Sequence, residues 1–304
     1  MPQSSPRRLS EHYSGIMPKK GWPERNLRYL RYRLVPQMFK RLEGDPKHPE
    51  LAPPPYGKAR ITWIGHASFF VQFEGHSILF DPNWAIWMGV VKRMRHPGIL
   101  LEHMPEVDLV LVSHAHFDHL HKKSLKVVEA REGIVVPRGS GDLVERLGFP
   151  EVREMKVWEE RLYSDLRVVH TPSHHWGARI GHDTHRDYGG FIVGNGQRSI
   201  FHCGDSAYFK GFKEIGKREE IDIALMPIGA YEPPSGREVH MNPEEALDAF
   251  EDLGARLMIP MHYGTFALSN EPPEEPLERL LAEADRRGLA DRILVAHPGE
   301  GVEF

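Results

Sequence analysis

The feature that most constrains how this chain folds is a histidine-rich run, Ser113 to His119 (SHAHFDH), directly after an almost wholly apolar stretch at residues 107–112. Such a stretch is typical of a strand buried on both faces. Residues two apart in extended backbone point to the same side, so His114 and His116 can bind one ion together while Phe117 points into the core. The sequence therefore predicts a metal site at the end of a buried strand.

The same run carries a second pair of ligands. The chain must turn after Phe117, and this turn presents Asp118 and His119 toward a neighbouring position. Imidazole and carboxylate ligands suit a borderline ion such as Zn²⁺, with Fe and Mn as alternatives. A cluster of surface histidines is the competing interpretation, but four ligands at this spacing rarely arise by chance.

Further ligands must come from elsewhere, because four side chains cannot saturate two ions. Three short segments with suitable residues each follow a predicted strand, where sites in open α/β folds tend to form. They are 171–176 with His174 and His175, 204–206 with Asp205, and 262–264 with His262.

The composition fits a cysteine-poor globular protein. The 304 residues include 19 His and one Cys, with a net charge of -4. One Cys excludes an internal disulfide framework, and the weak net charge gives no reason to expect nucleic acid as a partner. The start of the chain lacks an apolar leader, and no run nears the length of about 18 apolar residues that spans a bilayer. We therefore expect a cytoplasmic protein.

Periodicity and turn residues predict strands and helices from residue 59 onward. The clearest helix start is Asn242, followed by Pro243 and Glu245, with Gly254 closing that helix. The predicted strands span 59–64, 68–73, 77–80, 107–112, 133–137, 166–170, 191–193, 199–201, 223–226, 256–260 and 292–296, and the other helices span 122–131, 141–147 and 276–287. This order predicts central sheets with helices outside.

The sequence predicts an N-terminal extension with a Pro-rich linker, residues 1–57, and one domain that carries the metal site, residues 58–304. Residues 21–44 interleave aromatic and aliphatic side chains with Arg and Lys. Two interpretations stay open for this segment: a basic, aromatic surface that contacts anionic lipid head groups, and an extension packed on the main domain. Pro36 should break or kink any helix there.

Several short stretches make the chain similar to a known superfamily. The order His-x-His-x-Asp-His, a later His, Gly-Asp and a last His resembles the metallo-β-lactamase superfamily. Within it, the chain resembles the branch of N-acyl phosphatidylethanolamine-hydrolysing phospholipases D. The resembling stretches are 62–67, 113–120, 171–176, 204–205, 227–233, 242–246 and 262–268. The resemblance implies an α/β fold, an αββα sandwich of two mixed sheets flanked by helices.

The resemblance also implies a set of metal ligands. The pattern Ser-x-His-Trp selects His175 rather than His174, and the early Asp81 becomes a supporting residue. The implied ligands are His114, His116 and His175 for one metal ion, Asp118, His119 and His262 for a second, and Asp205 bridging both.

Catalytic roles are implied for two residues. Asp118 would orient the attacking hydroxide, and His240 would contact a phosphate oxygen or protonate a leaving group. For His240 an exposed loop position is the alternative. His66 is either a residue that orients a ligand or lines the cleft, or a structural histidine at a strand end.

Charge favours an anionic substrate. Two divalent ions, two ligand carboxylates and a bridging hydroxide leave one net positive charge, which suits a phosphodiester. The hypothesis is a dinuclear-metal hydrolase, a phosphodiesterase of the phospholipase D type, in which a metal-bridging hydroxide attacks an anionic small molecule or phospholipid. The polar segment 233–238 supports an alternative, a small-molecule lactonase or phosphoester hydrolase resembling ascorbate-6-phosphate lactonase.

A different class of protein also stays open. A non-catalytic metal-binding protein or a di-iron redox protein could use the same ligands, because fold alone does not settle chemistry. The resemblance further implies a homodimer. If the basic segment 21–44 contacts lipid, the protein would lie at the inner membrane face.

Overall fold

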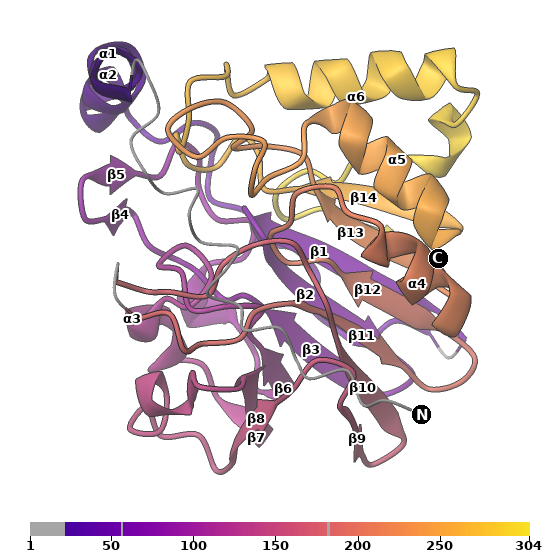
Figure 1. Cartoon of the computed structure of the whole chain (residues 1–304). Coiled ribbons are helices and arrows are strands. Elements are labelled where there is room, and N and C mark those ends of the chain that lie inside the picture. Colours follow the sequence, from indigo (N-terminus) through magenta and orange to yellow (C-terminus); the bar gives the residue numbers. More distant parts are fainter. Residues whose placement is uncertain (1–21, 56, 181–182) are drawn as a thin grey trace, which may run out of the picture.

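Two β-sheets form the centre of the computed structural model, which describes residues 22–55, 57–180 and 183–304 (Figure 1). The first sheet has the order β15 (Gly301–Glu303), β1 (Ala59–Gly65), β2 (Ser68–Phe73), β3 (His76–Phe80), β6 (Val107–Leu111), β7 (Ala130–Pro137) and β8 (Val152–Met155). The second has the order β14 (Leu257–Met261), β13 (Ile223–Pro227), β12 (Ser199–His202), β11 (Gly190–Gly194), β10 (Leu166–Thr171) and β9 (Glu160–Tyr163). Both sheets combine parallel and antiparallel pairs.

Helices cover the outer face of the second sheet. α4 (Gly211–Arg218), α5 (Pro243–Leu253) and α6 (Glu275–Arg286) pack side by side there (Figure 1). The first sheet is covered by loops with short helical turns. These are η4 (Leu101–His103), α3 (Lys122–Leu125) and η5 (Gly141–Leu143), while η6 (Ala290–Arg292) follows α6. The predicted α/β sandwich of two mixed sheets with flanking helices is therefore confirmed.

Alternation along the strands builds two hydrophobic cores. In β2, Phe69 and Val71 face the core between the sheets, while Phe70 faces the core on the outer side of the first sheet. β6 does the same, with Leu109 in the central core and Val110 in the outer one. Successive side chains in a strand point to opposite faces, so apolar runs such as these belong to strands buried on both sides.

The predicted cap of α5 is confirmed. Asn242 Oδ1 accepts from Glu245 N at 2.9 Å, Glu245 Oε2 accepts from Asn242 N at 3.2 Å, and Gly254 ends the helix at φ 67°. Each interaction satisfies a backbone group that a helix end leaves without a partner. The cap residue Asn242 lies two residues after His240, so the start of α5 lies close to His240 along the chain.

Three predicted elements are wrong. The helix predicted at 122–131 ends at Leu125, because the chain from Ala130 onward pairs with β6 and becomes β7. The helix predicted at 141–147 is only the short turn η5. The strand predicted at 292–296 reduces to one bridge between Ile293 and Met258, and the last strand is instead β15, which pairs with β1.

The described part of the N-terminal segment is helical and packs on the main domain. It comprises α1 (Trp22–Tyr29), the π-helical turn η3 (Leu30–Leu34) and α2 (Val35–Phe39). The expected break at Pro36 takes the form of this π-helical turn, whose wider spacing accommodates a residue without an N–H. Tyr29 Oη donates to Ala267 O at 2.7 Å, and Arg33 Nε donates to Asn270 O at 2.8 Å. Across the described residues we find no helix with the length and apolar character needed to cross a bilayer.

Candidate metal centre

The candidate ligands gather at one edge of the two sheets, just beyond the ends of six strands. In chain order, His66 follows β1, Asp81 follows β3, residues 114–119 follow β6, His175 follows β10, Asp205 follows β12, and His262 follows β14. Loops at strand ends can bring together residues that are far apart in sequence, as in open α/β folds. The sheets therefore collect side chains from almost the whole catalytic region at one place.

Four buried or half-buried side chains form the first cluster: His114, His116, His175 and Asp205. His116 Nδ1 lies 2.9 Å from His114 Nε2 and 3.2 Å from His175 Nε2. Asp205 Oδ2 lies 3.8 Å from the Nε2 atoms of His114 and His175. The His-x-His spacing therefore brings two imidazoles together, and His175, which follows β10 of the second sheet, lies beside them.

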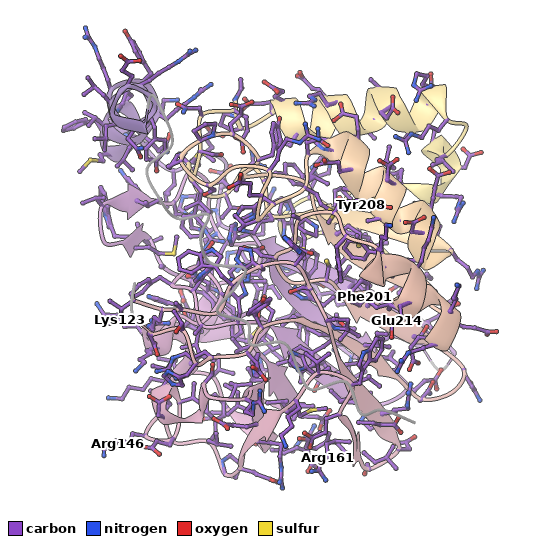
Figure 2. The ribbon with its side chains drawn as sticks, in the orientation of Figure 1. Lys123, Arg146, Arg161, Phe201, Tyr208 and Glu214 are labelled. Carbon is purple, nitrogen blue, oxygen red and sulfur yellow. The ribbon has the colours of Figure 1, made fainter. Side chains whose placement is uncertain are left out.

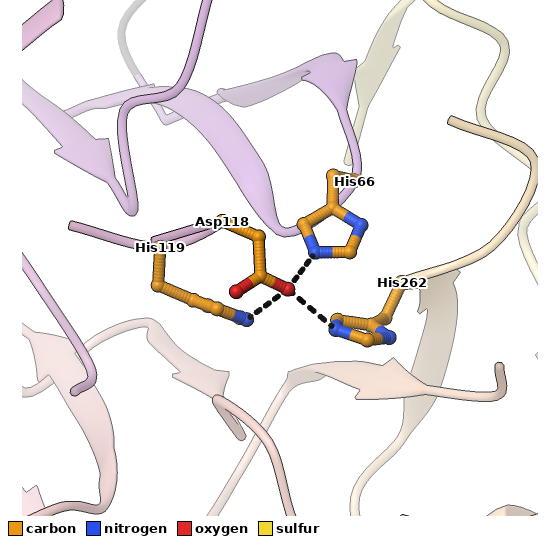
Figure 3. A group of neighbouring side chains, drawn as sticks. All are labelled: His66, Asp118, His119 and His262. Atoms are coloured by element: carbon orange, nitrogen blue, oxygen red, sulfur yellow. Dashed lines mark hydrogen bonds and ion pairs between the residues drawn. The ribbon is translucent and has the colours of Figure 1, made fainter. Parts of the chain in front are cut away.

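Asp118 is the centre of the second cluster, which Figure 3 shows with His66, His119 and His262 around it. Its Oδ2 atom lies 2.9 Å from His66 Nε2 and 3.6 Å from the Nε2 atoms of His119 and His262. The sequence did not decide between a role for His66 at the metal site and a structural role at a strand end. Its ring reaches Asp118 directly, so it belongs to the cluster rather than to a distant strand end.

One carboxylate oxygen joins the two clusters. Asp205 Oδ2 lies 3.1 Å from the Nε2 atoms of both His119 and His262, and it also faces the first cluster. Asp205 is almost completely buried, and its other oxygen has no hydrogen-bond partner among the described residues. This is the position that a ligand shared by two ions would occupy.

Surrounding acceptors orient the imidazoles. Asp81 Oδ2 accepts from His119 Nδ1 at 2.7 Å, Ser113 Oγ lies 2.9 Å from His114 Nδ1, and Val239 O accepts from His175 Nδ1 at 2.9 Å. A ring whose Nδ1 is held by an acceptor has Nε2 left for a metal ion, and the Nε2 atoms of these three rings face the clusters. Asp81 thus supports the site without entering it, as the resemblance implied.

The donor set fits a pair of divalent ions. Ligand atoms around a tetrahedral ion with bonds of about 2.0–2.1 Å lie about 3.3 Å apart. The distances between ligand atoms in the two clusters, from 2.9 to 3.8 Å, bracket this spacing. Converging lone pairs and buried carboxylates without enough donors are costly unless a cation joins them. Imidazole with carboxylate favours Zn²⁺, with Fe and Mn as alternatives.

Burial keeps three of the imidazoles neutral. Loss of solvent lowers the pKa of His66 to about 4, and that of His116 and His175 to about 3. Neutral imidazole is the form that binds a metal ion, so these rings are ready to do so throughout the neutral pH range.

Zinc affinity of the metal-free protein is expected to rise with pH. Burial opposes protonation of His262, yet Asp205 and Asp118 raise its pKa to about 9, and with Asp81 they raise the pKa of His119 well above its ordinary value. These protons must leave before the ring nitrogens can bind an ion. The apparent affinity should therefore rise at least about tenfold per pH unit between about pH 6.5 and 9.

The stability of the metal-free fold should change in the opposite direction. The contribution from His262 is fully present below about pH 6.5 and is lost as the pH rises through about 9, because the folded pKa exceeds the unfolded one. Zinc titrations of chelator-treated protein and denaturant unfolding at several pH values measure both effects. A zinc affinity that stays constant from about pH 6.5 to 8.5 contradicts this assignment.

Two of the cluster residues and Asp81 have backbone conformations that side chains rarely adopt. The φ angles are 58° at His66, 41° at Asp81 and 63° at His262. Hydrogen bonds hold these turns: His262 N donates to His66 O at 3.1 Å, and Trp63 Nε1 donates to the same oxygen at 2.9 Å. Strained residues of this kind collect at functional sites, where the surrounding structure maintains them.

Phe117 does not enter the core, so that prediction is wrong. It is 54% exposed, and the guanidinium of Arg179 lies 4.1 Å from its ring centroid. Arg179 also donates to the carbonyls of Ala115 and Leu120. The strand ends before the histidine run, so alternation no longer decides where Phe117 points. His116, Phe117 and Asp118 all reach solvent, and we call this the open side of the centre.

His240 lies beside both clusters rather than in an exposed loop. Its ring is buried, 5.1 Å from the ring of His175 and 5.2 Å from that of His262. Its Nδ1 atom lies 3.9 Å from Asp205 Oδ2. His174, by contrast, is exposed while its backbone is fixed by Ser206, which matches the choice of His175.

Arg93 is a structural feature of the centre that sequence reasoning missed. It is fully buried and donates to Asn83 O, Ile64 O and Arg95 O at 3.0–3.1 Å. Burial and nearby Arg95 lower its pKa to about 9, which leaves the guanidinium charged at neutral pH. Asn83 in turn donates to Asp118 O at 2.8 Å. Arg93 therefore ties together the loops that carry His66 and Asp118.

Replacing Arg93 by Met is expected to destabilise the fold by about 2–4 kcal/mol, because three buried carbonyls lose their donor. Denaturant unfolding measures this loss. Arg256→Met is the matched control, since the Arg256 side chain is 77% exposed, and a change within about 0.5 kcal/mol is expected there. Equal unfolding midpoints for the two variants would show that Arg93 has no such role.

Comparison with known proteins agrees with this geometry. Residues 76–263 match the Beta-lactamase superfamily domain. The chain is 32% identical over 255 residues to a UPF0173 metal-dependent hydrolase of Methanopyrus kandleri, covering 80% of this chain and 99% of that protein. It is also 32% identical over 256 residues to the mitochondrial N-acyl-phosphatidylethanolamine-hydrolyzing phospholipase D of Saccharomyces cerevisiae, covering 79% of this chain and 54% of that protein.

The chain is also similar to a solved structure of a metallo hydrolase. Igni18, a metallo hydrolase from Ignicoccus hospitalis, is 25% identical with a TM-score of 0.63, covering 81% of this chain and 98% of that one. Fold and site together define a metal-dependent hydrolase. The chain belongs to the metallo-β-lactamase superfamily, as its sequence indicated.

Proposed function

We propose that this hydrolase binds two divalent metal ions and cleaves phosphodiesters, with an N-acylated phospholipid as the substrate class. The observation that carries the proposal is the pair of adjoining ligand clusters with Asp205 Oδ2 between them. His114, His116 and His175 would hold one ion, and Asp118, His119 and His262 the other. When bound, two such ions lower the pKa of a shared water and polarise a phosphoryl oxygen.

Charge supports an anionic substrate. Asp118 and Asp205 lie in the clusters, and Asp81 is hydrogen bonded to His119. Three carboxylates would offset three of the four positive charges of two divalent ions, so the site carries one net positive charge as long as the shared water keeps its proton. A cationic, largely dehydrated site attracts a phosphodiester and stabilises the additional charge of its transition state.

Two residues of the chain have roles around the reacting group in this proposal. Asp118 is half-buried, so its carboxylate can orient a water molecule that enters from the open side. Burial lowers the pKa of His240 to about 3, and its Nδ1 atom has no hydrogen-bond partner among the described residues. A neutral imidazole suits a hydrogen bond to a phosphoryl oxygen better than donation of a proton.

Relatives support the choice of substrate. The yeast relative is named as an enzyme that hydrolyses N-acyl-phosphatidylethanolamine, and a Caenorhabditis elegans relative with the same activity in its name is 31% identical over 248 residues. The second of these is covered over 70% of its length. The stretches that resemble this branch include the turn around Ala230 and the segment after His262, which both adjoin the second cluster.

A panel of substrates tests the proposal. Metal-reconstituted protein is expected to hydrolyse bis(p-nitrophenyl) phosphate and N-acyl phosphatidylethanolamine, to lose both activities in chelator and to regain them with added zinc. Manganese and iron are tested in parallel, and elemental analysis of the purified protein identifies the metal. Turnover of lactones without turnover of either diester would overturn the phosphodiesterase assignment.

One observation keeps a small-molecule lactonase as a second candidate. The polar segment 233–238 leads directly into the site, because Gly236 O accepts from His240 N at 3.2 Å. Its Arg237 pairs with Glu245 on α5. A polar segment that contacts His240 suits a small hydrophilic substrate, and the lactone arm of the same panel decides between the two.

A further inference from the structure

We propose that the N-terminal helical segment and the β4–β5 hairpin form a docking face for an anionic lipid bilayer. The hairpin comprises β4 (Trp87–Met88) and β5 (Val91–Lys92). The docking face is defined by the apolar side chains of Leu27, Tyr32, Val35, Phe39, Trp87 and Val90. The inference deepens the proposed function, and its link to a lipid substrate rests on that function.

The docking face gathers several exposed large apolar side chains. Phe39 is 83% exposed, Leu27 64%, Tyr32 62%, Val90 58% and Trp87 44%. Single exposed apolar residues are normal on a protein surface, but a group of large ones signals a partner. Most of the other large apolar residues of the described chain are buried in the two cores.

Specific contacts join the helix and the hairpin into one surface. Lys92 Nζ donates to Lys40 O at 2.6 Å and to Met38 O at 3.2 Å, and it lies 5.3 Å from the centroid of the Trp87 ring. Glu43 N donates to Met94 O at 2.8 Å just beyond the hairpin. Figure 1 shows α1 and α2 directly beside β4 and β5 at one edge of the molecule. The apolar side chains therefore reach solvent from a single, fixed structure.

The charge of this surface is opposite to that of the whole chain. Residues 22–42 contain six Lys or Arg and one acidic residue, whereas the chain carries a net charge of -4. Arg28, Arg31, Lys40 and Arg41 are all exposed, and Figure 2 shows side chains extending outward around this helical segment. Basic residues around apolar ones attract anionic head groups, while the acidic remainder disfavours other orientations on such a surface.

A bilayer fits this face better than a second copy of the chain. In a symmetric dimer the same patch meets itself, so the two basic segments would lie against each other. Like charges brought into contact in this way repel. An anionic bilayer instead neutralises the Arg and Lys side chains and accepts protruding aromatic residues at the level of its head groups.

The docking face adjoins the candidate metal centre. Asn83 Nδ2 lies 3.2 Å from Met88 Sδ in the hairpin and donates to Asp118 O at 2.8 Å in the second cluster. On the other side, Tyr29 Oη donates to Ala267 O, five residues after His262. Direct contacts on two sides therefore join the docking face to the second cluster.

Vesicle binding tests the inference. The zinc-loaded full chain is sedimented with vesicles of phosphatidylcholine alone, and with vesicles in which about one fifth is phosphatidylglycerol. Binding is expected only with the anionic lipid and should weaken with salt. The double variants Phe39→Ser with Trp87→Ser, and Arg28→Glu with Arg31→Glu, should each bind at least about tenfold more weakly.

Matched controls separate docking from folding and catalysis. Leu162→Ser changes a side chain that is 67% exposed on β9, outside the docking face, and should leave vesicle binding unchanged. All variants should retain the unfolding midpoint and the turnover of bis(p-nitrophenyl) phosphate, because none of the changed residues lies in the clusters. Each variant is also sized by light scattering at several concentrations.

The outcomes distinguish this inference from the proposed function. Undiminished vesicle binding by the docking-face variants, or equal binding to neutral vesicles, overturns the inference. The inference is also overturned if the parent protein forms a dimer but does not bind vesicles, and the docking-face variants abolish that dimer. Vesicle binding without hydrolysis of either diester leaves the docking face intact and defeats the proposed function. Diester hydrolysis without vesicle binding supports the proposed function and overturns the docking face.

Discussion

Replacement of Asp205 by Asn is expected to lower kcat/KM by about 10³-fold and to release metal ions during gel filtration. Asn keeps the shape of Asp but loses the negative charge, and its amide group can no longer bridge two ions. The oxygen it alters lies 3.1 Å from both His119 and His262 and 3.8 Å from His114 and His175. Metal chemistry contributes several kcal/mol to a transition state, which corresponds to a factor of about 10³ in rate.

Kinetics and elemental analysis of the same preparation measure this effect. Asp165→Asn is the matched control, because Asp165 is 75% exposed and contacts only the distant His76 among its ion pairs in the described structure. Its activity and metal content should equal those of the parent protein. Full activity of Asp205→Asn with two ions still bound would remove Asp205 from the ligand set.

Replacement of His262 by Asn is expected to reduce the bound metal from two ions to one and to lower kcat/KM by about 10²–10⁴-fold. His262 is the ligand of the second cluster that comes from the second sheet. The shorter Asn side chain cannot reach Asp118, while Asn tolerates the φ of 63° at this position better than most residues. Loss of metal should therefore not come from a strained backbone.

A matched substitution at His297 gives the control. His297 is exposed and lies outside both clusters, so His297→Asn should keep two ions and full activity. Isothermal titration of chelator-treated protein with zinc counts the sites in each variant. Two zinc sites in His262→Asn with unchanged affinity would contradict a dinuclear centre built in this way.

The local part of the centre was predictable because short-range geometry determines it. His114 and His116 are two residues apart, and their ring nitrogens lie 2.9 Å from each other. The apolar residues before them are typical of a buried strand and form β6. The cap at Asn242 follows from backbone hydrogen-bonding needs within four residues. Such features depend on few neighbours, so the sequence alone carries them.

The long-range part of the centre rested on resemblance. Nothing in the sequence near His175, Asp205 or His262 specifies that these side chains lie beside His114. They follow strands of the second sheet, whereas His114 follows a strand of the first sheet. The role of His66 could not be decided from the sequence for the same reason. Its place beside Asp118 depends on a turn after β1 that His262 and Trp63 hold through the carbonyl of His66.

The failures also have physical causes. Helical periodicity at 122–131 was outweighed by pairing of β7 with β6, which buries Ala130, Ile134 and Val136 in the outer core. The edge strands β8 and β9 carry charged residues on exposed positions and give little hydrophobic signal. Arg93 lies in a stretch rich in basic residues, and its complete burial depends on three carbonyls from distant loops.

The most direct test of the central claim is a crystal of the zinc-loaded protein measured at the zinc absorption edge. We expect two anomalous peaks about 3.5–4 Å apart, one among His114, His116 and His175 and one among Asp118, His119 and His262, with Asp205 touching both. A single peak, or peaks away from these side chains, would contradict the dinuclear centre on which the proposed function depends.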